Sequence, residues 1–237
     1  MVAIPNGLPQ TISLQSATMH EPSIRKLDSL FSQMGSNSQM PGESWRNLKL
    51  AAEAYSLLTD HIPLRCAQRI TPYTRIRILS SMLEEIDTLS MPRFAIQVRH
   101  YQNTMFELIH DAEDREVDMA YDEWHGDPRL YRRPLQSIRD ELAYDEKRLQ
   151  QYADLEIPMS TWCKRYDHLL HFDPAERTFE WEMHIYDVER ECHEALQGMG
   201  RGRGSCHSYW AAMKEAWKKR GIEWRSPGEM NTGVRFD

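Results

Sequence analysis

The sequence predicts an all-α protein, a multi-helix bundle of about eight helices that includes a long antiparallel helical hairpin. Apolar residues recur three and four positions apart along most of the chain, which is the spacing of one face of an α-helix. Residues 43–125 contain no glycine, although glycine is the residue that most often ends a helix. We find no segment with the period-two pattern of a strand and no repeat of fixed period.

Several prolines stand where helices are expected to begin. Pro22 lies in the first turn of the first expected helix, which Gly35 ends. Ser44 is suited to N-cap the next helix, because a serine hydroxyl accepts a bond from a free backbone N–H. Thr71–Pro72 and Ser90–Met91–Pro92 each place a proline in the first turn after a helix boundary. These signals define the helix starts in the first part of the chain.

Two apolar seams predict the hairpin. The helix that begins at Pro92 carries apolar residues at alternating spacings of four and three, and a continuous helix would reach Trp124. A second seam runs over residues 135–152, after a turn at 125–134. Two such seams joined by a short turn are typical of antiparallel helices, so we expect a hairpin over about 91–156.

The last part of the chain repeats the same start and stop signals. We expect Ser160 to cap a shorter helix, and Asp173–Pro174 to begin a longer one that Gly198 stops. The final helix follows a cap at Ser205 and has Gly221 at its C′ position.

Composition divides the chain into three segments. Residues 1–20 show no sustained periodicity and are expected to form a flexible N-terminal arm. Residues 21–198 form the helical body. Residues 199–237 contain a Gly/Arg hinge, a basic Trp-rich helix and a C-terminal tail.

The composition is that of an ordinary globular protein, with 41% hydrophobic and 27% charged residues. No run of about 18 apolar residues occurs, so we expect no membrane association. The first residues lack the charged and apolar blocks of a signal peptide, and four cysteines in 237 residues do not indicate a disulfide scaffold. We therefore expect an intracellular protein, cytoplasmic or nuclear.

The net charge of −7 is unevenly distributed. From residue 199 onward the chain carries a net charge of +4, which leaves −11 on the remainder. The Gly/Arg hinge also ends at the start of a helix, where free N–H groups and the helix dipole favour an anion. We therefore predict anion or partner binding by polar and basic residues of this segment: Arg201, Arg203, Ser205, His207, Lys214, Lys218, Lys219 and Arg220. The alternative is that the glycines form only a flexible linker.

The final helix also has an apolar face. Cys206, Trp210, Met213 and Trp217 follow one another at the spacing of a single helical stripe. Such a stripe is more often a packing face than a platform for nucleic-acid bases. We expect it to pack either on the protein's own acidic body or on a partner chain.

One short string suggests a metal-dependent enzyme. In FELIHDAED, His110 lies beside Asp111, and Glu107 precedes His110 by one helical turn. The string resembles the His-Asp signature of HD-type phosphohydrolases, and the resemblance covers fewer than ten residues. It implies an all-helical enzyme that binds divalent metal through His110 and Asp111, with Glu107 as a further candidate ligand. The family also needs an upstream histidine and a downstream aspartate, for which this chain offers His61 or His100 and Asp140 or Asp145.

The sequence contains no complete catalytic motif, and we expect no cofactor. The Cys192–His193 and Cys206–His207 pairs do not indicate zinc, because adjacent residues point about 100° apart around a helix. We therefore favour a non-enzymatic helical interaction or adaptor protein, whose basic C-terminal segment contacts an acidic protein partner or nucleic acid. The seams also leave a homo-oligomer open. The alternative is the HD-like phosphohydrolase centred on His110 and Asp111.

Overall fold

The computed structural model describes residues 21–63, 70–109, 135–197 and 204–236. Within these ranges the protein is all-α, with nine α-helices and no strand, which confirms the predicted fold class. The α-helices are α2 (Glu21–Gln39), α3 (Asn47–Ser56), α4 (Pro72–Glu84), α5 (Pro92–Phe106), α7 (Leu135–Ala153), α8 (Met159–Tyr166), α9 (Phe179–Ala195), α10 (Ser205–Lys218) and α11 (Pro227–Met230). Short helical turns are η1 (Ser44–Arg46), η2 (Leu57–His61) and η3 (Pro174–Arg177).

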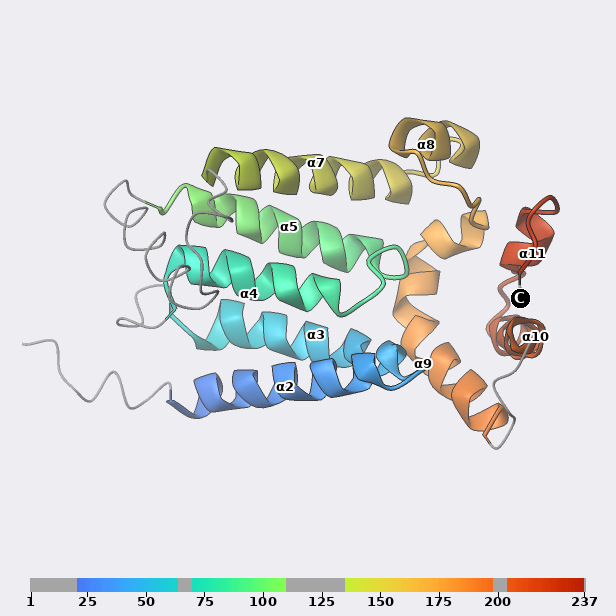
Figure 1. Cartoon of the computed structure of the whole chain (residues 1–237), viewed down its shortest axis with the longest axis horizontal. Helices are drawn as coiled ribbons and strands as arrows, with labels where there is room; N and C mark the ends of the chain where they lie inside the picture. Colours follow the sequence, from blue (N-terminus) through green and yellow to red (C-terminus); the bar gives the residue numbers. More distant parts are fainter. Residues whose placement is uncertain (1–20, 64–69, 110–134, 198–203, 237) are drawn as a thin grey trace, which may run out of the picture.

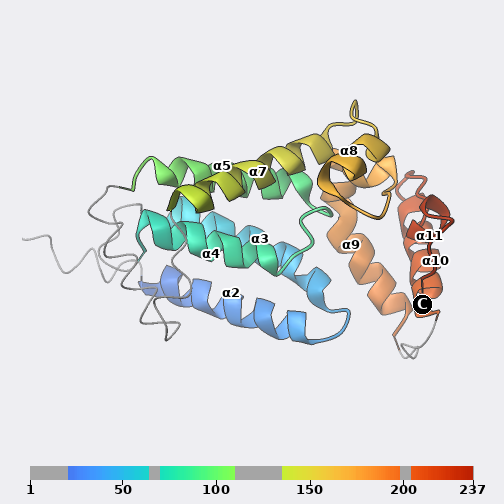
Figure 2. The same ribbon diagram turned by 45° about the horizontal axis from the view of Figure 1, so that its top comes forward.

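The helices form a bundle that is closed at one end by a transverse helix. Helices α2, α3, α4, α5 and α7 run along the long axis of the molecule (Figure 1). Helix α9 crosses their end at a steep angle, and α10 and α11 lie on its outer side in both views (Figure 2). No helix in the described ranges is both long enough and apolar enough to cross a membrane.

Two of the predicted helix boundaries are confirmed in detail. Thr71 caps α4 by accepting a bond from the backbone N–H of Thr74 at 3.1 Å, with Pro72 in the first turn. Gly221 has the left-handed φ of 74° expected at C′. The backbone N–H of Ile222 reaches back to the carbonyl of Trp217 at 3.1 Å, which completes a Schellman motif.

Other boundaries differ from the prediction, because glycines elsewhere make the turns. Helix α2 continues through Gly35 to Gln39, and the chain turns at Gly42, where φ is 74°. Ser44 begins η1 and makes no capping bond. Gly204, with a φ of 83°, occupies the N-cap position of α10, so Ser205 is the first helical residue rather than the cap.

Three further helix boundaries lie at residues other than those predicted. Ser160 lies inside α8, whose N-cap is Pro158. Asp173 does cap a helical turn, but that turn is η3, and Thr178 begins α9 by accepting a bond from the N–H of Trp181 at 3.2 Å. Helix α5 ends at Phe106 instead of continuing to 124, because the next N–H groups bond three residues back and tighten the final turn.

Helices α5 and α7 pack side by side in opposite directions. Arg99 of α5 pairs with Asp145 at 2.8 Å, whereas Glu107, the residue after α5, pairs with Arg139, nearer the start of α7, at 2.5 Å. Ile76, Met105 and Leu142 form a small apolar cluster beside them. The connection falls in residues 110–134, which lie outside the described residues, so the continuous hairpin stays a prediction.

A buried arginine closes the end of α3. Arg75 is fully buried, and its guanidinium donates to the carbonyl oxygens of Leu58, Ile62 and Pro63. These carbonyls lie at or just after the π-helical turn η2, where the α-helical bonding pattern has ended. The arginine satisfies acceptors that would otherwise be buried without donors.

One apolar cluster joins the bundle to the C-terminal segment. It includes Leu30 of α2, Leu79 of α4, Ile185 of α9 and Trp217 of α10. The ring of Trp217 stacks on that of Trp181 with centroids 4.1 Å apart and planes inclined by 19°. Helix α10 therefore docks on the protein's own body and buries an aromatic side chain there.

Polar contacts hold the residues after α10 against the same body. Trp224 donates from its indole nitrogen to Glu176 at 2.8 Å, and Arg225 pairs with the buried Asp173 at 2.8 Å. Asn231 bonds both the N–H and the carbonyl of His171, at 2.7 and 2.9 Å. The capping residues of η3 thus also anchor the chain that follows α10.

Asn47 is a buried polar junction between three helices. Its Nδ2 lies within 3.1 Å of the Met34 carbonyl, the Ser38 hydroxyl and the Glu85 carbonyl. Its Oδ1 accepts a bond from Asn37 at 2.9 Å. The side chain joins the last turns of α2 to the start of α3 and the end of α4.

We expect Asn47→Ala to lower the free energy of unfolding by about 2–4 kcal/mol, because it leaves buried acceptors without a donor and creates a cavity. Urea denaturation monitored by circular dichroism measures this change. Gln33→Ala, on the exposed face of α2, is the control and should cost less than about 1 kcal/mol. A cost for Asn47→Ala no larger than that of the control would contradict the assigned junction.

Because of Glu176, we expect the free energy of unfolding to depend on pH. Burial raises the pKa of this carboxyl to about 7, so the fold disfavours its charged form. The folded state holds the proton where the unfolded chain has lost it, and this contribution to stability falls as pH rises from about 4.5 to about 7. Glu176→Gln keeps an acceptor for Trp224 and removes the titration.

We therefore expect the unfolding free energy of the wild type to fall by about 2–3 kcal/mol relative to Glu176→Gln across this pH interval. Urea denaturation of both proteins at a series of pH values measures the difference. Parallel profiles for the two proteins would show that Glu176 does not titrate with a raised pKa.

Candidate functional site

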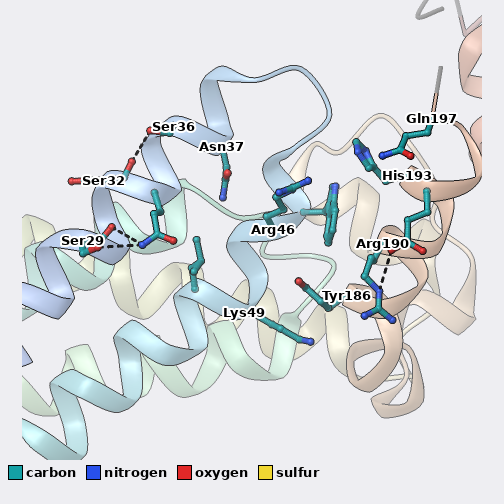
Figure 3. A pocket seen from close by; sticks show the side chains of 14 residues that line it. Ser29, Ser32, Ser36, Asn37, Arg46, Lys49, Tyr186, Arg190, His193 and Gln197 are labelled. Carbon is teal, nitrogen blue, oxygen red and sulfur yellow. Dashed lines mark hydrogen bonds and ion pairs between the residues drawn. The ribbon is translucent and has the colours of Figure 1, made fainter. Parts of the chain in front are cut away.

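A groove with converging charged side chains lies between α2, the start of α3 and α9. Its volume is about 820 Å³. Figure 3 shows its lining side chains, which come from α2 on one side and from α9 on the other, with η1 and α3 between them. We call it the α2–α9 groove. It is open to solvent along its length, so it suits an extended ligand or a partner segment better than an enclosed small molecule.

The α2 wall of the groove is polar but uncharged. It consists of one helical stripe: Ser29, Ser32, Gln33, Ser36 and Asn37. The opposite face of α2 is apolar and buries Leu27, Leu30 and Met34 in the core, which is why the polar stripe faces outward.

Local bonds already use donors of this wall. The Ser32 hydroxyl donates to the carbonyl of Asp28 at 3.0 Å, and the Ser36 hydroxyl donates to the carbonyl of Ser32 at 2.9 Å. Gln33 donates its amide nitrogen to the Ser29 carbonyl at 3.3 Å. The hydroxyl oxygens keep free lone pairs, so the wall presents acceptors to a ligand.

Three basic side chains line the rest of the groove. Arg46 pairs with Glu43 at 2.5 Å, and Arg190 pairs with Asp187 on its own helix at 3.3 Å. Lys49 instead places its ammonium 3.8 Å from the centre of the Tyr186 ring. In the described part of the chain, Lys49 has no carboxylate within ion-pair distance. It is therefore the cation most available to an anionic ligand.

Aromatic rings pack beneath the cations. Trp45 contacts Tyr186 with ring centroids 5.2 Å apart and His193 at 5.8 Å, and the Arg46 guanidinium lies 5.3 Å from the Trp45 ring. His193 also reaches Glu43 with its Nε2 atom at 3.2 Å. These contacts tie the α9 wall to the start of α3, and they cover ring faces with the protein's own side chains.

Lys49 gives the groove a positive charge with no described carboxylate partner, whereas Arg46 and Arg190 pair with Glu43 and Asp187 just outside the lining. The lining itself contains three cations and one carboxylate, Glu194, which lies 3.9 Å from Arg190. Charge-assisted bonds from arginine and lysine to phosphate or carboxylate are the strong polar contacts such a surface can form.

The residues predicted at the C-terminal segment lie elsewhere. Arg201 and Arg203 fall outside the described residues. Ser205 and His207 are exposed at the start of α10, with the His207 ring packed edge-on to Trp210 at 5.2 Å. The structure does not bring them next to the α2–α9 groove lining.

Most of the remaining predicted cations pair with the protein's own carboxylates. Lys214 bonds Glu229, and this bond lowers the pKa of that carboxyl to about 2. Arg220 and Lys219 both reach Glu191, whose pKa is lowered chiefly by the Arg220 hydrogen bond. Lys218 is exposed. Lys219 and Arg220 therefore help to dock this segment on α9, whereas the Lys214–Glu229 pair lies within the segment.

The tryptophan stripe of α10 is a packing face. Met213 and Trp217 are buried, and Trp210 is half-buried against Gly228, where an added Cβ would meet the indole ring at 3.0 Å. Cys206 is only partly buried. The stripe packs on the protein's own body, which is one of the two expected alternatives.

The metal-site alternative cannot be assembled from described residues. His110 and Asp111 lie outside them, and Glu107 bonds Arg139. No group of three or more His, Cys, Asp or Glu side chains suited to hold a metal occurs in residues 21–63, 70–109, 135–197 and 204–236. The HD-like interpretation stays a prediction.

The chain matches no protein-family model, no curated protein and no solved structure. Function is therefore inferred from the geometry and charge of the α2–α9 groove.

Removing the three groove cations should leave the fold intact. Arg46, Lys49 and Arg190 are exposed, and exposed ion pairs contribute about 0.2–1 kcal/mol each. We expect the combined Arg46→Gln, Lys49→Gln and Arg190→Gln variant to lose no more than about 2 kcal/mol of unfolding free energy, measured by urea denaturation. Loss of the folded state would show that these cations are structural.

Proposed function

We propose that this protein is a non-enzymatic helical interaction protein that binds an acidic segment of a partner protein in the α2–α9 groove. The observation that carries the proposal is the convergence of Arg46, Lys49 and Arg190, from η1, α3 and α9, on one groove with a single lining carboxylate. Charges brought together from separate elements and left in solvent are available to a partner.

Lys49 is the feature that favours the groove over the C-terminal segment. Lys214, Lys219 and Arg220 already pair with Glu229 and Glu191, so a partner carboxylate would have to compete with an intramolecular one. The same holds for Arg46 and Arg190 of the groove, which pair with Glu43 and Asp187. Lys49 has only the ring of Tyr186 as its described partner. An exposed cation–π contact contributes about 0.5–1 kcal/mol, which leaves Lys49 free to move to an anion at small cost.

Two features favour a protein partner over nucleic acid. Nonspecific single-strand binding depends on aromatic faces that are open to stacking bases. Here Arg46 lies over Trp45, and Lys49 lies over Tyr186. The α2 wall presents acceptors, which suit the backbone N–H groups of a peptide and not a phosphodiester backbone without such donors.

Fluorescence anisotropy with two labelled probes tests the proposal. The probes are a twelve-residue glutamate-rich peptide and a dT12 oligonucleotide. Wild-type protein is compared with the groove variant (Arg46→Gln, Lys49→Gln, Arg190→Gln) and with a matched C-terminal variant (Arg203→Gln, Lys218→Gln, Lys219→Gln). We expect the acidic peptide to bind about tenfold more weakly to the groove variant, from three exposed charge contacts, and unchanged to the C-terminal variant.

The matched C-terminal variant removes the same number of positive charges as the groove variant. A nonspecific loss of electrostatic attraction would therefore weaken peptide binding equally in the two variants. If only the C-terminal variant binds the acidic peptide more weakly, the contact lies in the Gly/Arg segment and not in the groove. Groove-dependent binding of dT12 with no binding of the peptide would make nucleic acid the partner instead.

A further inference from the structure

We infer that the group anchored in the α2–α9 groove is a phosphomonoester on a serine or threonine of the partner segment. This inference rests on the proposed function, that the groove binds an anionic segment of a protein. It adds the chemical class of the anchor and assigns Lys49 as the residue that selects it.

The resident carboxylates argue against a simple carboxylate anchor. Arg46 holds Glu43 at 2.5 Å, and Arg190 lies within 3.9 Å of both Asp187 and Glu194. A partner carboxylate that displaces one of these exchanges one single-charged acceptor for another and gains little. A phosphomonoester carries a charge of about −1.5 to −2 and three acceptor oxygens, so it can bond an arginine that keeps its resident partner.

The position of Lys49 supplies a second reason. Its ammonium lies on the ring of Tyr186, and Arg190 follows Tyr186 by one turn of α9. Side chains four residues apart on a helix are neighbours, at about 5–6 Å between Cβ atoms. Lys49 from α3 and Arg190 from α9 therefore both lie near Tyr186 (Figure 3). Two cations near one ring suit a compact dianion better than a row of separated carboxylates.

The α2 wall supplies the third reason. Its five lining residues, Ser29 to Asn37, include no charged side chain. Positive charge is thus concentrated on the α3 and α9 side, and the facing wall can accept bonds from the peptide backbone on either side of the anchor. A partner segment with one strongly anionic residue and otherwise neutral residues fits a groove whose cations lie on the α3 and α9 side and whose α2 wall is uncharged.

Three degenerate ten-residue peptide libraries test the inference. They are identical except for a fixed central residue, which is phosphoserine, serine or glutamate. Binding to wild-type protein, Lys49→Gln, Lys49→Arg and Lys218→Gln is measured by anisotropy at constant ionic strength, with inorganic phosphate as a competitor. Lys218 is a matched control because it is an exposed helical lysine outside the groove.

We expect the phosphoserine library to bind at least tenfold more tightly than the glutamate library, and the serine library to bind weakest. Lys49→Gln should reduce phosphoserine binding at least fivefold, Lys49→Arg should retain most of it, and Lys218→Gln should not change it. Inorganic phosphate should compete only at much higher concentration than the phosphoserine library.

The other outcomes are distinguishable. Equal, Lys49-dependent binding of the phosphoserine and glutamate libraries would overturn the phosphate anchor and leave the proposed function standing. Competition by inorganic phosphate at library concentrations would indicate a site for the free ion and not for a segment. No Lys49-dependent binding of either anionic library would overturn both proposals.

Discussion

The buried amide of Asn47 fixes the corner at which α2, α3 and α4 meet, and the groove is built on that corner. A buried polar group that needs every partner in place tolerates one arrangement of the chains around it. Asn37, which bonds the Asn47 oxygen at 2.9 Å, is itself part of the groove wall. The position of the polar α2 stripe relative to Arg46 and Lys49 therefore follows from a hydrogen-bond network in the core.

Helix α9 supplies the other wall and is fixed by a different polar contact. Glu182 accepts the backbone N–H groups of Arg93 and Phe94 at 3.0 and 2.7 Å and so caps the start of α5 from outside. Burial raises the pKa of this carboxyl, which these same bonds oppose. Tyr186 and Arg190 follow Glu182 at successive turns. The cap at the start of α5 thereby also helps to position Tyr186 and Arg190 in the groove.

Sequence patterns predict the fold much better than they predict the site. Periodicity and cap-then-proline signals identify helices because both depend on neighbours within a few residues. The predicted caps at Ser44 and Ser205 are wrong because the chain turns at Gly42 and Gly204 instead, where φ is positive. The serines themselves give no sign that the turn lies at a neighbouring glycine. The groove could not be found locally, since residues 29–50 and 186–197 meet only after folding. In the sequence, only the Ser/Gln stripe of α2 indicates part of the groove.

The stacking of Trp217 on Trp181 has a consequence for how the chain matures. One face of α9 stays uncovered until α10 arrives, and α10 follows α9 in the chain. During synthesis, the apolar surface around Trp181 is therefore exposed until α10 has been made and has docked. The described body therefore completes its core only after α10 has been synthesised, and until then it exposes apolar surface of the kind that makes folding intermediates prone to aggregate.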